Sequence, residues 1–167
     1  MADFRPRALL AHLVSYGVDF VVVGGIAGTL HGSPRDTFDL DICPSMDEAN
    51  LEVLGRALVD LDAGLRGLEE DVAFVPDAKT LHGMEILTLD TRFGPLDVLV
   101  RPDGCPPYDQ LRRRAARMDV GPAAVAVASI DDLLEMKRAA DRIKDRADVE
   151  ELEAIQRLRR RFGRGRR

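Results

Sequence analysis

The chain has 167 residues and a net charge of −5, and 46% of its residues are hydrophobic and 32% charged. This length suits one compact domain, and the balance excludes both an intrinsically disordered chain and two independent enzyme cores. Because no segment approaches the ~20 apolar residues of a membrane-spanning helix and residues 1–7 lack the layout of a signal peptide, we expect a cytoplasmic protein without a membrane partner.

Hydrophobic periodicity and turn residues divide the first hundred residues into helices and strands. In chain order, the predicted elements are a helix over 6–16, a buried strand over 20–23, a Gly-Gly turn at 24–25, a short helix over 26–31, a strand over 37–42 and a helix from 45 to 61. Ser45 and Glu48 have the spacing of a capping box at the start of that last helix. Residues 84–89 and 96–100 predict an antiparallel hairpin, and residues 72–75 a weaker strand.

The C-terminal part predicts one strand, over 123–128, and two helices. The first helix is capped by Ser129, and the second runs from about Asp145 to Arg161. We therefore expect a single α/β (α+β) domain. Residues 1–104 form its mixed β-sheet core with flanking helices, and residues 105–167 form a C-terminal strand and helical segment packed on that core.

Residues 157–167 contain seven arginines and no acid, so an acidic body carries a basic tail. Such a tail is suited to binding the phosphate backbone of a nucleic acid. An equally weighted alternative is that it is a solvated, partly disordered terminus. The two cysteines, Cys43 and Cys105, lie far apart without a C-x-x-C pair or a histidine cluster. They predict neither a zinc site nor a disulfide framework.

The strongest chemical signal is V-V-V-G-G-I-A-G-T-L-H-G-S-P-R-D-T-F-D-L-D-I, residues 21–42. Two glycines after a buried strand let backbone N–H groups approach a phosphate, and the next helix points its positive end at the same place. Asp39 and Asp41 are two residues apart on a predicted strand, so both carboxylates leave one face. The two carboxylates repel each other unless a cation lies between them. Because Mg²⁺ prefers one or two carboxylates together with phosphate oxygens, the segment predicts a site for a magnesium-bound triphosphate.

A third acid, Asp97, is centred in G-P-L-D-V-L-V, residues 94–100. An acid among apolar strand residues calls for a functional reason, because burying a charge is costly. Nucleotidyl transfer needs metal to position the triphosphate and a carboxylate that bridges two metal ions or acts as a base. We expect Asp97 in that role, with a plain edge residue as the alternative.

The Gly24-Gly25 turn, the Asp39-Leu40-Asp41 pair and the later Asp97 resemble the signature of the DNA polymerase β-type nucleotidyltransferase superfamily. A fuller pattern is similar to AbiEii and MenT toxin-type nucleotidyltransferases; it consists of His31-Gly32, Arg35 and Thr37 before the acids and L-L-E-M-K-R-A-A-D-R-I-K-D-R-A-D-V-E-E-L, residues 133–152, after them. The resemblance implies a nucleotidyltransferase-type mixed-sheet core and EC 2.7.7-type transfer of a nucleotide from a nucleoside triphosphate. For the toxin members it also implies the tRNA 3′ end as acceptor and control by an antitoxin protein.

The resemblance also implies roles for individual residues. Metal would be held by Asp39 and Asp41, with Asp97 as the third carboxylate, and phosphates by Gly24, Gly25, Arg35 and Thr37. Lys137 would reach the triphosphate from the helical part, and Asp145 would orient the basic groups.

Simpler alternatives stay open. Arg35 could pair only with Asp36, Lys137 could face solvent, and Thr37 could be a mere strand former. His31 is expected to be structural, with a hydrogen bond to the backbone. The same core could modify a protein hydroxyl or a small molecule such as an aminoglycoside, or the chain could be a non-catalytic nucleotide-binding module.

Overall fold

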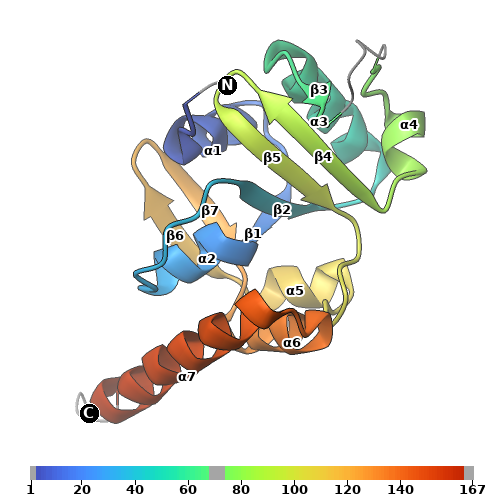
Figure 1. Ribbon diagram of the computed structural model, residues 1–167. Helices are drawn as coiled ribbons and strands as arrows, with labels where there is room; N and C mark the ends of the chain where they lie inside the picture. Colours follow the sequence, from blue (N-terminus) through green and yellow to red (C-terminus); the bar gives the residue numbers. More distant parts are fainter. Residues whose placement is uncertain (1–2, 68–73, 164–167) are drawn as a thin grey trace.

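A mixed seven-stranded sheet organises the computed structural model, which describes residues 3–67 and 74–163 (Figure 1). In chain order the elements are α1 (Pro6–Ser15), β1 (Phe20–Val23), α2 (Gly24–His31), β2 (Leu40–Pro44), α3 (Glu48–Asp60), β3 (Gly64–Leu65), α4 (Ala78–His82), β4 (Ile86–Thr91), β5 (Gly94–Leu99), α5 (Tyr108–Arg114), β6 (Ala116–Val120), β7 (Ala123–Val127), α6 (Ile130–Ala140) and α7 (Ile143–Gly163). The strand order is β3-β4-β5-β2-β1-β7-β6. The α/β fold class predicted from the sequence is confirmed.

The helices pack on the sheet through leucine faces. Leu9, Leu10 and Leu13 of α1 and Leu54 and Leu58 of α3 are fully buried, and each such side chain contributes about 1.5–3 kcal/mol through its transfer from water. Helix α2 packs on β1 and β2 and is itself contacted by α6 and α7. The C-terminal end of α7 extends beyond the body (Figure 1). No helix in the described residues is long and apolar enough to cross a membrane.

The register of the central strands brings distant residues into one row. β1 pairs antiparallel with β2 and sets Val23 opposite Asp41, and β2 pairs parallel with β5 and sets Asp41 opposite Asp97. On the next strand, β4, Thr88 lies opposite Asp97. Directly paired residues point to the same face of a sheet, so this row carries two acids on one face.

Several element boundaries differ from the predicted ones. The turn predicted at residues 24–25 is the first turn of α2, which begins at Gly24 itself. Strand β2 begins at Leu40, so Asp39 lies in a bend just before it. The strand predicted over residues 72–75 lies partly outside the described residues, and residues 74–75 are not in a strand.

The start of α3 is also corrected. Its N-cap is Asp47, whose carboxylate accepts a hydrogen bond of 3.0 Å from the Asn50 N–H. Ser45, the predicted cap, donates instead to the Asp47 carboxylate. Asp47 is the better cap because it is the residue directly before the first helical turn and carries a charge that favours a helix N-terminus. The cap of α6 at Ser129 is confirmed by its bond with the Asp132 N–H.

Cys43 and Cys105 are both free thiols, but the fold brings them into contact. Interaction with the Cys105 thiol, together with burial, raises the pKa of the Cys43 thiol far above its usual range. The same interaction lowers the pKa of Cys105. The thiols therefore join strand β2 to the segment between β5 and α5, a contact that their separation in sequence did not indicate.

Candidate functional site

The two glycines make room for an acid at the start of α2. Gly24 has φ of +65°, and a Cβ built there would overlap the Asp41 carboxylate. The Gly25 N–H faces that carboxylate closely enough to lower the pKa of Asp41. A Cβ on Gly25 would lie 2.6 Å from Thr37 Oγ1. The Gly-Gly pair thus lets Asp41 and Thr37 lie directly against the helix N-terminus, a close approach that any larger residue would prevent.

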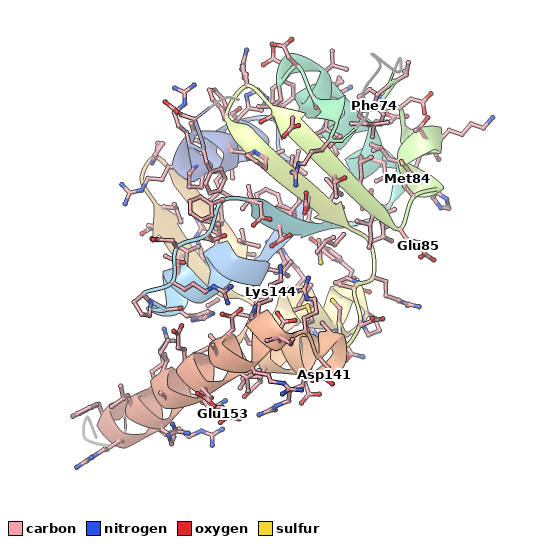
Figure 2. The ribbon with its side chains drawn as sticks, viewed as in Figure 1. Phe74, Met84, Glu85, Asp141, Lys144 and Glu153 are labelled. Atoms are coloured by element: carbon pink, nitrogen blue, oxygen red, sulfur yellow. The ribbon has the colours of Figure 1, made fainter. Side chains whose placement is uncertain are left out.

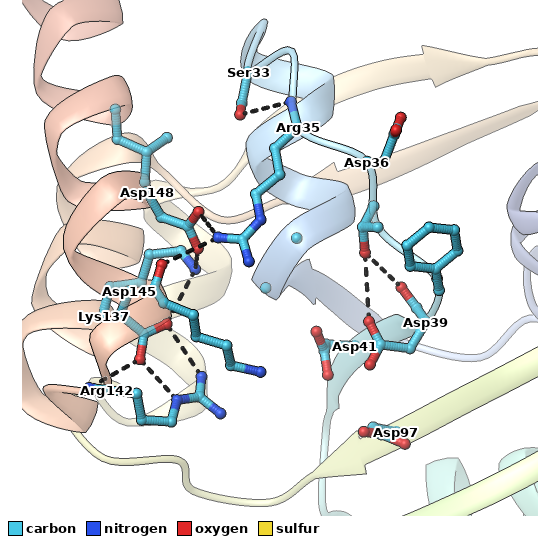
Figure 3. A pocket seen from close by; sticks show the side chains of 16 residues that line it. Ser33, Arg35, Asp36, Asp39, Asp41, Asp97, Lys137, Arg142, Asp145 and Asp148 are labelled. Carbon is cyan, nitrogen blue, oxygen red and sulfur yellow. Dashed lines mark hydrogen bonds and ion pairs between the residues drawn. The ribbon is translucent and has the colours of Figure 1, made fainter.

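Three carboxylates line one wall of a cavity of about 340 Å³ (Figure 3). Asp41 and Asp97 come from paired positions on β2 and β5, and Asp39 from the bend before β2. Burial, followed by the charges of Asp39 and Asp97, raises the pKa of Asp41 to about 7. Because three acids share one low-dielectric wall, a cation there would relieve their repulsion.

Asp97 also contacts an arginine that sequence reasoning missed. Burial raises the pKa of Asp97, and the Arg66 guanidinium opposes that rise. Arg66 Nη2 lies 3.0 Å from Asp97 Oδ1 and 2.7 Å from the Leu89 carbonyl oxygen, to which it donates. The ion pair leaves Asp97 Oδ1 buried without a hydrogen-bond partner among the described residues. Arg66 follows β3, and no sequence pattern ties that strand to Asp97.

Thr37 positions an acid rather than standing free. Its hydroxyl lies 3.4 Å from Asp39 Oδ1 and 3.3 Å from the Asp39 carbonyl oxygen, within reach to donate to either. This contact and the packing against Gly25 place Thr37 between the helix start and the first acid. Its predicted contact with a phosphate remains a prediction.

The opposite wall carries cations held by acids of α7 (Figure 3). Lys137 of α6 places Nζ 2.6 Å from Asp148 Oδ2 and 3.6 Å from Asp145 Oδ1. Arg142, between the two helices, binds Asp145 through Nε at 2.7 Å and Nη2 at 3.2 Å. Asp145 is only 2% exposed, and its two cations hold its pKa low against the burial that would raise it. Asp145 thus contacts two basic groups, and the role that the resemblance implied for it stays a prediction.

Arg35 joins this wall from the segment between α2 and β2. Its Nη1 binds the Asp148 carboxylate and donates to the Lys144 carbonyl oxygen at 3.1 Å. The simpler alternative, a pair with Asp36, is not what the structure contains. Lys144, in the first turn of α7 near α2 (Figure 2), also lines the cavity.

His31 has a structural place, as expected. It is 6% exposed, and its Nε2 donates to the Ala128 carbonyl oxygen at 2.8 Å, which ties α2 to the end of β7. Burial lowers its pKa, so the ring is neutral at pH 7. The His31 carbonyl oxygen in turn accepts from Arg159 of the basic tail. Residues 157–163 of that tail belong to α7, and residues 164–167 lie outside the described part.

The acidic wall offers carboxylates of the kind that a magnesium ion uses. Within residues 3–67 and 74–163, no three His, Cys, Asp or Glu side chains lie close enough to hold a metal ion by themselves. Mg²⁺ rarely uses an all-protein cage and takes one or two carboxylates together with phosphate oxygens and water. Asp39 and Asp41 could supply that carboxylate pair, and Asp97, whose Oδ1 lies 3.0 Å from Arg66 Nη2, is on the same wall.

The sequence interpretation missed four cavity residues of the helical part, namely Arg142, Lys144, Asp148 and Leu152. A signal for Asp148 was present, because it lies three residues after Asp145 and so shares its face of a helix. Arg142 had no such signal, since it lies in the break between α6 and α7, which only the fold defines.

Three solved structures show what this chain is similar to. The crystal structure of the lincosamide antibiotic adenylyltransferase LnuA with bound lincomycin is 16% identical, with a TM-score of 0.62 over 93% of this chain and 99% of that chain. An antigenic nucleotidyltransferase-like protein from Paracoccidioides brasiliensis is 20% identical, with a TM-score of 0.51 over 91% and 73% of the two chains. The antibiotic-resistance factor ANT(2'')-Ia is 13% identical, with a TM-score of 0.53 over 95% and 93%.

At these identities the likeness concerns the fold, so the chain has the fold of nucleotidyltransferases. The sequence itself matches no protein-family model and no curated protein. The narrower resemblance to AbiEii and MenT toxins therefore remains a prediction.

Proposed function

We propose that this protein is a Mg²⁺-dependent nucleotidyltransferase that transfers a nucleoside monophosphate from a nucleoside triphosphate to an acceptor hydroxyl. The observation that supports this most directly is the cavity at the start of α2, in which Asp39, Asp41 and Asp97 face Lys137 and Arg35 (Figure 3). The acidic wall suits a divalent cation, and the basic wall suits phosphate oxygens. A metal-bound triphosphate needs both.

Each wall has its own task in this proposal. Asp39 and Asp41 hold Mg²⁺, which positions the triphosphate and offsets its charge. Lys137 and Arg35 donate to the phosphate oxygens from the opposite side, and the N-terminus of α2 adds a positive partial charge. The protein supplies placement and fixed charges, the two effects that provide most of the acceleration in phosphoryl and nucleotidyl transfer.

Asp97 receives the proton of the acceptor. As the acceptor oxygen bonds to the α-phosphorus, its proton passes to the Asp97 carboxylate, the bond from the α-phosphorus to the bridging oxygen breaks, and pyrophosphate leaves. A base works best when its pKa lies near the working pH. The burial that raises the pKa of Asp97 moves it in that direction.

For the acceptor, the likeness to LnuA favours a small molecule with a hydroxyl group. That protein is named as a lincosamide antibiotic adenylyltransferase with bound lincomycin, and the likeness covers 99% of its chain. ANT(2'')-Ia, named as an antibiotic-resistance factor, is covered over 93%.

A tRNA 3′ end is the second candidate, supported by the charge of α7. The last turns of that helix carry Arg157, Arg159, Arg160 and Arg161, and Arg159 donates to the His31 carbonyl oxygen. Clustered arginines favour a phosphate backbone. In this version the protein is the toxin of a toxin-antitoxin pair and is held inactive by a cognate antitoxin protein.

The test supplies purified protein with Mg²⁺, each α-labelled nucleoside triphosphate in turn, and either total tRNA or a panel of hydroxyl-bearing antibiotics. We expect label on an antibiotic, lost in Asp41→Asn. Label on tRNA would select the second candidate, and growth arrest that requires Asp41 would then support the toxin role. Label on neither acceptor, with no binding of triphosphate, would leave a non-catalytic module.

A further inference from the structure

A single carboxylate joins two cations that come from different parts of the chain. Asp148 Oδ2 binds Lys137 Nζ of α6 at 2.6 Å, and Asp148 Oδ1 binds Arg35 of the segment between α2 and β2. The side chains of Asp148 and Lys137 are each only 13% exposed, whereas that of Arg35 is 42% exposed. Asp148 therefore links a partly exposed arginine to a largely buried lysine.

Arg35 and Lys137 retain N–H donors for the cavity while they are paired with Asp148. Arg35 uses only Nη1 in the hydrogen bonds found among the described residues, so Nε and Nη2 remain available. Lys137 carries three N–H donors, of which Asp148 accepts one. Both residues line the cavity that holds the three acids. A carboxylate that engages one side of each cation leaves the other side for oxygens of a ligand.

From this arrangement we infer that Asp148 is a positioning residue of the triphosphate site, which holds Arg35 and Lys137 together so that both donate to one triphosphate. The inference rests on the proposed function. Asp148 acts through the two cations and does not touch the substrate itself. Asp145 cannot replace it, because Asp145 is occupied by Arg142 and lies 3.6 Å from Lys137.

The physical gain is preorganisation. An exposed arginine has many rotamers, and a ligand that must order it loses part of its binding energy. The ion pair with Asp148 orders Arg35 before the triphosphate arrives. In the opposite role, the Asp148 carboxylate would occupy the position of a phosphate group and would have to be displaced by the triphosphate. Removal of the Asp148 charge weakens triphosphate binding in the first role and strengthens it in the second, so a binding measurement separates the two.

The experiment measures binding of each radiolabelled nucleoside triphosphate with Mg²⁺ by equilibrium dialysis, in the wild type and in Asp148→Asn. Asparagine keeps the shape and removes the charge, and we expect binding weaker on the order of tenfold. The matched control is Glu151→Gln. Glu151 lies one turn further along α7 and accepts a 2.6 Å hydrogen bond from Ser33, on the same segment as Arg35 but without a cation. Removal of the Glu151 charge should change triphosphate binding less than twofold.

A double-mutant cycle with Arg35→Gln separates positioning from a general structural role. If Asp148 acts by holding Arg35, each single substitution already removes the contact between the two residues. The double variant should then bind the triphosphate little more weakly than whichever single variant binds it less well. Asp148→Glu keeps the charge and should bind the triphosphate more tightly than Asp148→Asn does. It also provides a second test if Asp148→Asn does not fold. Unchanged or tighter binding by Asp148→Asn, or fully additive losses in the cycle, would overturn the inference alone. A wild type that binds no triphosphate would overturn the proposed function and the inference with it.

Discussion

Asp41 and Asp97 occupy paired positions on the adjacent parallel strands β2 and β5, so two acids from distant parts of the chain share one face of the sheet. Burial and the neighbouring charges of Asp39 and Asp97 raise the pKa of Asp41 from 3.8 to about 7. The protein thus retains an acid in a place that penalises its charged form, which is typical of a functional site.

Asp41→Asn should stabilise the protein in the absence of metal. In the unfolded chain Asp41 ionises near pH 3.8, and in the folded chain only near pH 7, so its ionisation costs stability as the pH rises between these values. The stability gain in the variant should be below about 1 kcal/mol at pH 4 and grow to at most about 4 kcal/mol by pH 8. Urea unfolding at both pH values, with EDTA present, measures it. An equal effect at both pH values would contradict the titration of Asp41.

Magnesium should raise the melting temperature at pH 8 and do so less at pH 5. At pH 8 Asp41 is charged and a bound cation relieves its repulsion with the neighbouring acids, whereas at pH 5 a proton on Asp41 already does so. Thermal melts with MgCl₂, compared with NaCl at equal ionic strength, check this. The specific part of the increase should disappear in Asp41→Asn, and an increase of equal size in that variant would place the ion elsewhere.

Gly24→Ala should cost more stability than Gly121→Ala. Both glycines have φ of +65°, so alanine brings the same backbone strain of about 1–2 kcal/mol to each. At Gly121 the added Cβ meets only Arg7 Cδ at 4.0 Å, while at Gly24 it overlaps the Asp41 carboxylate. Chemical denaturation compares the two, and transfer activity should fall about a hundredfold only in Gly24→Ala, because Asp41 is displaced. Equal losses in the two variants would mean that only the backbone matters.

Arg66→Met should move the acid limb of the pH profile of kcat/KM to higher pH. Burial raises the pKa of Asp97 and Arg66 opposes that rise, so without the arginine the pKa rises further and the carboxylate ionises later. Arg92→Met is the control, since Arg92 pairs with Asp60 outside the cavity. An acid limb that does not move in Arg66→Met would argue against Asp97 as the group that accepts the proton.

The local parts of the site could be predicted because short-range patterns determine them. The buried strand at residues 20–23 and the closely following helix are visible in the apolar run and the glycines, and the fold confirms both elements. The boundary of β2 was predicted too early, because alternation over 37–42 continues through a bend that faces the cavity. Patterns of side-chain type do not show where backbone pairing begins.

The sequence by itself determined the fold class, the pair of acids after the Gly-Gly motif and the candidate third acid, since each depends on neighbours within a few residues. Only the tertiary structure decided that Asp97 lies beside Asp41, that Arg66 reaches Asp97, and that Asp148 fastens Arg35 to Lys137. The reason is physical: strand register and helix packing are set by burial over the whole core, and no spacing along the chain records them.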